Sequence, residues 1–127
     1  MSHRVIISLG SDTRQEHNIA RATAALSALL RGAGSGPAAP AGARFSRLLW
    51  TEDVSGSGHR YLNRLAAGYT TLTAEQLGRR LKEIEAAQGR LPGAVTIDLD
   101  LLLYDDCRHH LSDWPRPYIQ QLINDIL

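Results

Sequence analysis

The sequence has few cysteines and little net charge, two features on which several classes of protein depend. It holds one cysteine, Cys107, which excludes an internal disulfide framework and a multi-cysteine zinc site. A lone cysteine also suits a reducing compartment. The formal net charge of +1 provides no general electrostatic attraction to nucleic acid or to an anionic membrane. The hydrophobic and charged contents, 43% and 21%, are those of an ordinary soluble globular protein.

Long apolar runs are also missing. None approaches the roughly 20 residues that span a bilayer, and the start M-S-H-R-V-I-I-S-L-G lacks the apolar region and cleavage site of a signal peptide. We therefore expect a cytoplasmic protein with no membrane partner. The length predicts one domain over 1–127. Within it, the Gly/Ala/Pro-rich stretch 32–42 is predicted to be a flexible loop.

The spacing of apolar residues predicts an α+β fold. Two segments with capping-box spacing, starting at Thr13 and Thr73, are expected to begin helices. The remaining predicted elements are strands over 4–9, 43–51, 61–72 and 95–104, and a last helix over 118–127. The first six elements have the β-α-β-β-α-β order of a ferredoxin-like core, an antiparallel sheet with helices on one face. The last helix is added at the C-terminal end.

The strand 95–104, V-T-I-D-L-D-L-L-L-Y, carries two carboxylates inside an apolar run. Alternation along a strand places Asp98 and Asp100 on one face, which Thr96 and Leu102 share. The opposite face is expected to be the core face, with Ile97, Leu99, Leu101 and Leu103. Two carboxylates this close are unfavourable without a positive charge between them. The pair therefore indicates either a Mg²⁺ site or an acidic strand face in solvent.

Four segments occur in an order that resembles one family. They are an L-G-S turn before a helix with Asn18, then Tyr61-Leu62-Asn63, then Ile84-Glu85 with Gly89-Arg90, then Thr96-Ile97-Asp98-Leu99-Asp100. Together they resemble the 6-hydroxymethyl-7,8-dihydropterin pyrophosphokinases of folate biosynthesis. The resemblance covers nearly the whole chain, apart from the 32–42 loop and a shortened stretch after Tyr104. Its most specific motif is T-I-D-L-D-L-L-L-Y.

The resemblance implies a reaction and a set of ligands. Members transfer the diphosphate of ATP to the hydroxymethyl oxygen of the reduced pterin, with two Mg²⁺ ions that the matching residues Asp98 and Asp100 would hold. Such ions bridge the triphosphate and orient the alcohol. Arg116, always charged and able to bind a phosphate with two hydrogen bonds, is expected to act with them in catalysis. Its alternative role is that of a solvated surface charge.

The resemblance also assigns binding residues. The pterin is expected to contact Thr51, Tyr61, Asn63 and Tyr118, with the two tyrosines on either side of the flat ring. Ordinary packing is the alternative role for these tyrosines. The nucleotide is expected to contact Glu85, Arg90, His110 and Arg116. The adjacent His109 and His110 have no third ligand nearby in sequence, so a polar loop is favoured there over a zinc site.

The chain departs from the family pattern in ways that bear on catalysis. The segment 91–95, L-P-G-A-V, replaces a longer, arginine-rich mobile loop, and Val95 stands where the family has arginine. Those arginines clamp the triphosphate and exclude water on closure. Glu52 and Asp53 stand in place of prolines beside the pterin position, and Asp12 in place of asparagine.

These departures leave two hypotheses open. One is a divergent but active pyrophosphokinase in which Lys82, Arg90, Arg108 or Arg116 supplies the missing positive charge. The other is a catalytically impaired or repurposed relative that binds a pterin-like ligand without efficient transfer. A ferredoxin-like nucleic-acid binder is disfavoured, because the charge is near neutral and no strand carries a run of basic and aromatic residues.

Overall fold

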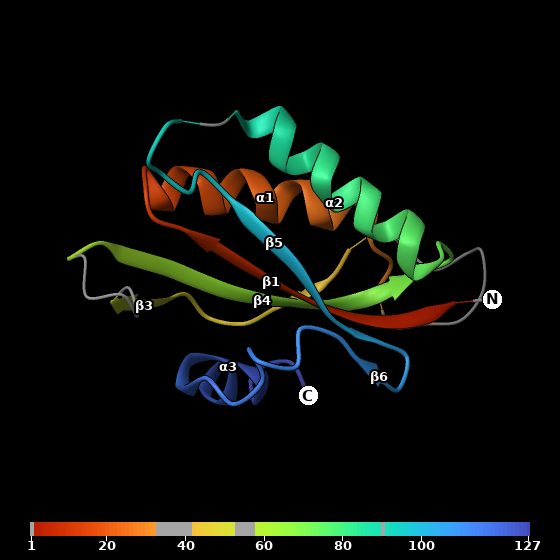
Figure 1. The fold of residues 1–127 in the computed structure, drawn as a ribbon. Helices are drawn as coiled ribbons and strands as arrows, with labels where there is room; N and C mark the ends of the chain where they lie inside the picture. The colour runs from red at the N-terminus through yellow and green to blue at the C-terminus, as the bar shows by residue number, and fades with distance from the viewer. Residues whose placement is uncertain (1, 33–41, 53–57, 90) are drawn as a thin grey trace.

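One antiparallel sheet organises the chain. The computed structural model describes residues 2–32, 42–52, 58–89 and 91–127. Within these ranges the elements are β1 (His3–Ser11), α1 (Gln15–Leu29), β2 (Arg44–Phe45), β3 (Leu49–Glu52), β4 (Arg60–Thr70), α2 (Ala74–Gln88), β5 (Asp98–Tyr104), β6 (Cys107–Arg108) and α3 (Pro117–Ile123). The strands are arranged β2-β4-β1-β5-β6, and β3 also pairs with β4 (Figure 1). The predicted α+β, ferredoxin-like core is confirmed.

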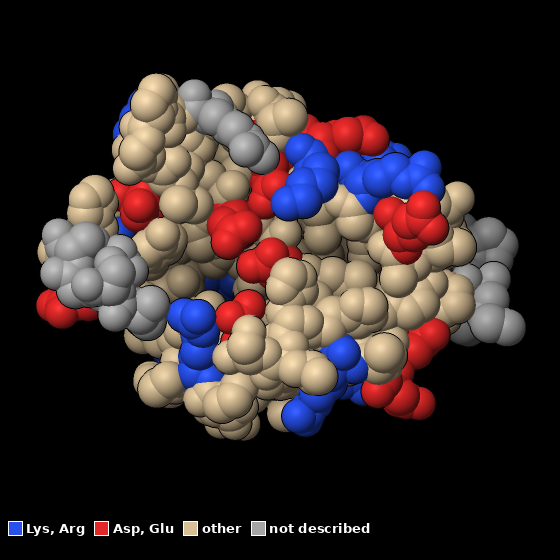
Figure 2. Space-filling model, in the orientation of Figure 1, with Lys and Arg blue, Asp and Glu red and all other residues tan. Residues whose placement is uncertain are grey.

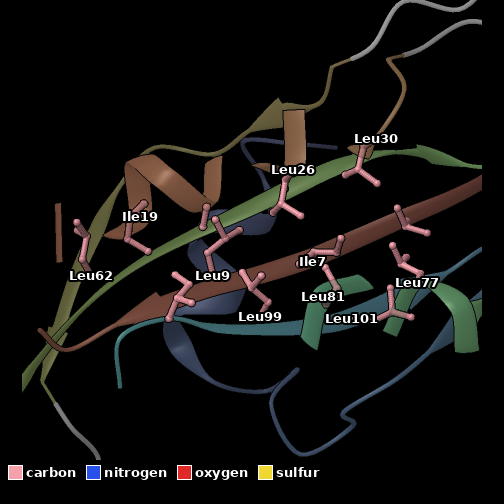
Figure 3. Packing of buried hydrophobic residues seen from close by; sticks show 14 residues of the cluster. Ile7, Leu9, Ile19, Leu26, Leu30, Leu62, Leu77, Leu81, Leu99 and Leu101 are labelled. Atoms are coloured by element: carbon pink, nitrogen blue, oxygen red, sulfur yellow. The ribbon is translucent and has the colours of Figure 1, made fainter. Parts of the chain in front are cut away.

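Helices cover both faces of the sheet. α1 and α2 lie on one face, as predicted, while α3 lies against the opposite face (Figure 1). The larger apolar core lies between the sheet and the first two helices; Figure 3 shows Ile7, Leu9 and Leu99 from the strands directed at Leu26 and Leu81 from the helices. None of the helices in the described ranges has the length and hydrophobicity to cross a bilayer.

A second, smaller core seats α3. Ile119 and Leu122 of the helix are fully buried and pack with Ile6, Leu65 and Leu102. The helix is shorter than the predicted 118–127, because its last regular residue is Ile123 and a turn follows. Trp114 joins the same cluster, and its indole N–H donates to the carbonyls of Leu102 and His109. This packing holds the segment before α3 against β5.

A bulge in β5 changes the predicted faces near the end of this strand. Ile7 pairs with Leu101 and Ile6 with Leu103, so Leu102 has no partner on β1. An extra residue on one strand reverses the alternation beyond it. Leu101 consequently packs toward α1 and α2, while Leu103 packs toward α3. The prediction that Leu103 shares the face of Leu101 was therefore wrong, although Ile97 and Leu99 do face that core.

Two other local predictions need correction. The expected strand 43–51 is divided into β2 and β3, because the chain leaves the ladder at Ser46, whose buried hydroxyl accepts the Leu65 N–H at 2.8 Å. The expected capping box at Thr13 does not form, since α1 begins after Arg14, which has φ 41° and makes no side-chain cap. The second box, at Thr73, is confirmed: Thr73 and Gln76 cap each other. Most of the predicted 32–42 loop lies outside the described residues.

The turn that leads into β5 is fastened to the end of β1. The Ser11 hydroxyl donates to the Thr96 carbonyl at 2.6 Å. The Val95 N–H donates to Asp12 Oδ1 at 2.7 Å, and the Asp12 N–H donates to the Val95 carbonyl at 3.0 Å. The Asp12 side chain is only 8% exposed. These bonds set the position at which β5 enters the sheet, two residues before Asp98.

This fastening predicts the behaviour of Asp12 variants. Asp12→Ala leaves the Val95 N–H without its acceptor and should lower the free energy of unfolding by about 1 kcal/mol. Asp12→Asn keeps a side-chain oxygen at the same place, so its free energy of unfolding should be close to that of the original chain. Urea unfolding of the three proteins measures the difference. Equal stability of the alanine variant and the original chain would contradict this account.

Candidate active site

A pocket opens between the sheet and the start of α3. β5 contributes Asp98 and Asp100, and β4 contributes Tyr61 and Asn63. The remaining lining residues come from β1, the end of β3 and the segment around α3; they are Ser8, Leu9, Gly10, Glu52, Asp113, Arg116 and Tyr118. Six residues predicted from sequence to form a site thus line a single cavity, although they are spread over nearly sixty positions of the chain.

The acidic pair sits in an electrostatically unfavourable place. The pKa of Asp98 is raised to about 6, mainly because the carboxyl is partly buried, and further because Asp100 and Glu85 are close. Burial also raises the pKa of Asp100, with Asp113 and Glu85 adding to the shift while His110 and Lys82 oppose it. Figure 2 shows acidic side chains gathered around a hollow, with Lys and Arg side chains on two sides.

Glu85 approaches this pair from α2. Its side chain is 5% exposed, and its Oε2 accepts the Leu99 N–H at 2.8 Å. The Lys82 ammonium lies 3.4 Å from Oε1. Glu85 therefore ties the helix to the strand between the two aspartates. It also lines a second pocket, in which Asp98 is shared with the first.

The second pocket extends from Asp98 along the segment before β5. Besides Lys82, Glu85 and Asp98, it is lined by Gly89, Leu91, Ala94, Val95, Thr96 and Ile97. The wall formed by 91–95 carries no charge. The Thr96 hydroxyl is buried without a hydrogen-bond partner among the described residues. Arg90, predicted to contact nucleotide, lies outside the described residues.

Asn63 is fixed by hydrogen bonds from its amide group. Its Nδ2 donates to Thr51 Oγ1 at 2.8 Å and to the Leu49 carbonyl at 3.2 Å. Both donors are thus used inside the protein, and Oδ1 remains as the acceptor that the pocket can offer a ligand. Thr51, predicted to touch the pterin, does not line the pocket and instead orients Asn63.

The α3 side of the pocket contains an ion pair that sequence reasoning missed. Arg116 Nε lies 3.1 Å from Asp113 Oδ1, and Arg116 is the residue that precedes the first turn of α3. His110 Nε2 lies 3.7 Å from Asp100 Oδ1. Burial, more than any neighbouring charge, raises the pKa of the Tyr118 hydroxyl. The i, i+3 spacing of Asp113 and Arg116 was the available sequence signal.

The donor set suits a hard divalent cation. The exposed Asp98 and the half-buried Asp100 provide carboxylate oxygens that are close enough to repel each other, and Mg²⁺ prefers carboxylate ligands. Among the described residues, Asp100, His110 and Asp113 also offer ligand atoms within 4.8 Å of one another. A bound dication would offset both the loss of hydration and the repulsion that raise the pKa of Asp98.

The raised pKa of Asp98 predicts a pH-dependent cost to stability. Between the ordinary carboxyl pKa and about 6, the folded chain holds a proton that the unfolded chain releases, so stability falls as pH rises through this window. Above about pH 6, the charged carboxylate of Asp98 lowers the free energy of unfolding by about 1 kcal/mol, after allowance for solvent screening.

Without divalent metal, Asp98→Asn should therefore be the more stable protein at pH 7.5, and the difference should vanish near pH 4. Thermal unfolding across this range in the presence of a chelator measures it. Asp106→Asn, at an exposed acid of the β5–β6 turn, is the matched control. A variant that is destabilised equally at every pH would argue against the repulsion.

A family model described as 7,8-dihydro-6-hydroxymethylpterin-pyrophosphokinase (HPPK) matches residues 6–123. The match includes every described residue that lines the two pockets. A search of curated proteins found no match. Because the family model spans nearly the whole chain, and the earlier resemblance points the same way, the chain belongs to the 7,8-dihydro-6-hydroxymethylpterin pyrophosphokinase family.

Proposed function

We propose that this chain transfers the diphosphate of ATP to the hydroxymethyl oxygen of 6-hydroxymethyl-7,8-dihydropterin, in a Mg²⁺-dependent step of folate biosynthesis. The observation that carries the proposal is the position of Asp98, which is shared by two adjoining pockets. A nucleotide in one pocket and a pterin in the other would meet above the acidic pair. The family match supports the same reaction.

The first pocket supports pterin binding. Tyr61 and Tyr118 come from different elements and line the same cavity, so a flat heterocycle can stack on either ring. Each such contact favours binding by about 1 kcal/mol beyond the area buried. Asn63 Oδ1 would accept a hydrogen bond from an N–H of the pterin edge, since both amide donors are committed to Leu49 and Thr51.

The second pocket supports nucleotide binding. Its wall is apolar at Leu91, Ala94 and Val95, and it becomes charged toward Asp98. A nucleotide lying along it would direct its phosphates at the acidic pair and at Arg116 across the first pocket. Asp98 and Asp100 would hold the metal ions; when bound, such ions neutralise the charge on the transferred phosphoryl groups.

The residues themselves contribute positioning and charge. Arg116 would donate to phosphate oxygens, and His110, beside Asp100, would do so when protonated. No described residue is required as a strong base, because phosphoryl transfer relies mainly on alignment and charge stabilisation. The uncharged wall at 91–95 is the observation that favours the alternative, a relative that binds a pterin-like ligand without efficient transfer.

A turnover assay separates these functions. The chain, incubated with hydroxymethyl-dihydropterin and Mg·ATP, should release AMP and form the pterin diphosphate. Asp100→Asn should lower the rate about 100-fold or more, because it removes a carboxylate that would hold the Mg²⁺ ions on which charge stabilisation of the phosphates depends. Asp106→Asn should not change the rate. Pterin binding without AMP release would favour the alternative, and failure to bind pterin or nucleotide would refute the proposal.

Asn63 variants test the pterin position. Asn63→Ala should weaken pterin binding about tenfold, the loss expected for one hydrogen bond to a fixed acceptor. The affinity for Mg·ATP should stay the same, since Asn63 lies in the first pocket only. Calorimetric titration with each ligand measures both affinities. Equal weakening for the two ligands would indicate a general disturbance of β3 and β4 rather than a pterin contact.

A further inference from the structure

We propose that Lys82 binds the polyphosphate of the nucleotide and supplies the positive charge that the segment 91–95 lacks. The inference rests on the proposed function, because it assigns a phosphate contact within the nucleotide pocket. Lys82, on α2, would be a second phosphate-binding cation, and its position and partners differ from those of Arg116.

Lys82 stands at the mouth of the second pocket. It lies one turn before Glu85 on α2 and lines the cavity together with Glu85 and Asp98. Its side chain is 72% exposed, whereas that of Glu85 is 5% exposed. The long stem therefore has freedom to move, and its attachment point is fixed on a helix that packs against the sheet.

Glu85 directs the ammonium group toward the acidic strand. Lys82 Nζ lies 3.4 Å from Glu85 Oε1, and the other oxygen of Glu85 accepts the Leu99 N–H. The charge of Lys82 also lowers the pKa of both Asp98 and Asp100, which agrees with an ammonium group near both carboxylates. A phosphate chain crossing Asp98 would pass this group.

The ion pair with Glu85 leaves Lys82 available to a ligand. Water reaches the exposed ammonium group of Lys82 and screens its attraction to the buried carboxylate of Glu85, so the ammonium group can also turn to a ligand. A polyphosphate with several negative oxygens competes well for such an ammonium group. Lysine, a compact charge on a flexible stem, can follow phosphate oxygens as they move during transfer.

Other described cations on α2 are less suited to this role. Arg79 pairs with Glu75 at 3.0 Å, and Arg80 Nε lies 3.7 Å from Glu83. Neither arginine lines the second pocket, in which Lys82 is the one cation among the described lining residues. Arg116 lies on the other side of the acidic pair, in the first pocket. A phosphate chain over Asp98 would thus lie between a cation from α2 and a cation from the start of α3.

Binding measurements test the inference without relying on turnover. Lys82→Met should weaken binding of Mg·ATP about tenfold or more, the effect expected for loss of one charge-assisted contact. Lys82→Arg should restore most of the affinity. Arg79→Met, on the same helix and similarly exposed, is the matched control and should bind like the original chain. Calorimetry with Mg·ATP and with adenosine distinguishes a phosphate contact, because adenosine binding should not change.

Two results would overturn the role of Lys82. One is unchanged Mg·ATP affinity in Lys82→Met, and the other is an equal loss in Arg79→Met or with adenosine. If the original chain binds Mg·ATP through Lys82 but releases no AMP, the proposed transfer fails while the inference about Lys82 stands. If AMP is released at the same rate and the same KM for ATP in Lys82→Met, the inference fails while the proposed function stands.

Discussion

Repulsion among carboxylates at one end of the sheet is the constraint on which this structure depends. Asp98 and Asp100 lie two residues apart on β5, and Glu85 reaches them from α2. Loss of hydration, and after it repulsion from Asp100 and Glu85, raises the pKa of Asp98 to about 6. A chain selected only for stability would not place three acids here, so the arrangement points to function. A bound cation is the simplest way to relieve it.

Other parts of the fold hold this unfavourable cluster in place. Ser11 and Asp12 fasten the turn before β5, and the buried carboxylate of Glu85 accepts the Leu99 N–H between the two aspartates. On the opposite face, Trp114 and the apolar side of α3 pack against β5, which keeps Arg116 at the edge of the pocket. The backbone of the acidic strand is therefore held from both faces.

Periodicity was enough to predict most of the fold, because burial of an apolar face decides most of these elements. The alternation of side chains along a strand placed Asp98 and Asp100 on the same face, and the order of motifs indicated the family. It could not reveal the bulge at Leu102 or the break at Ser46, since both depend on pairing with other strands. It missed Asp113 because the pocket wall forms only when α3 folds back on the sheet. The functional roles of the site residues remain predictions.

The most direct test is to measure the pKa of Asp98 with and without Mg²⁺, by carboxyl-carbon NMR across the acid range. The account predicts a value of about 6 in the metal-free chain and a clear fall when Mg²⁺ is added, as the cation neutralises the repelling carboxylates. An ordinary carboxyl pKa that does not respond to Mg²⁺ would contradict it, because Asp98 would then be a solvated surface acid rather than part of a metal-binding site.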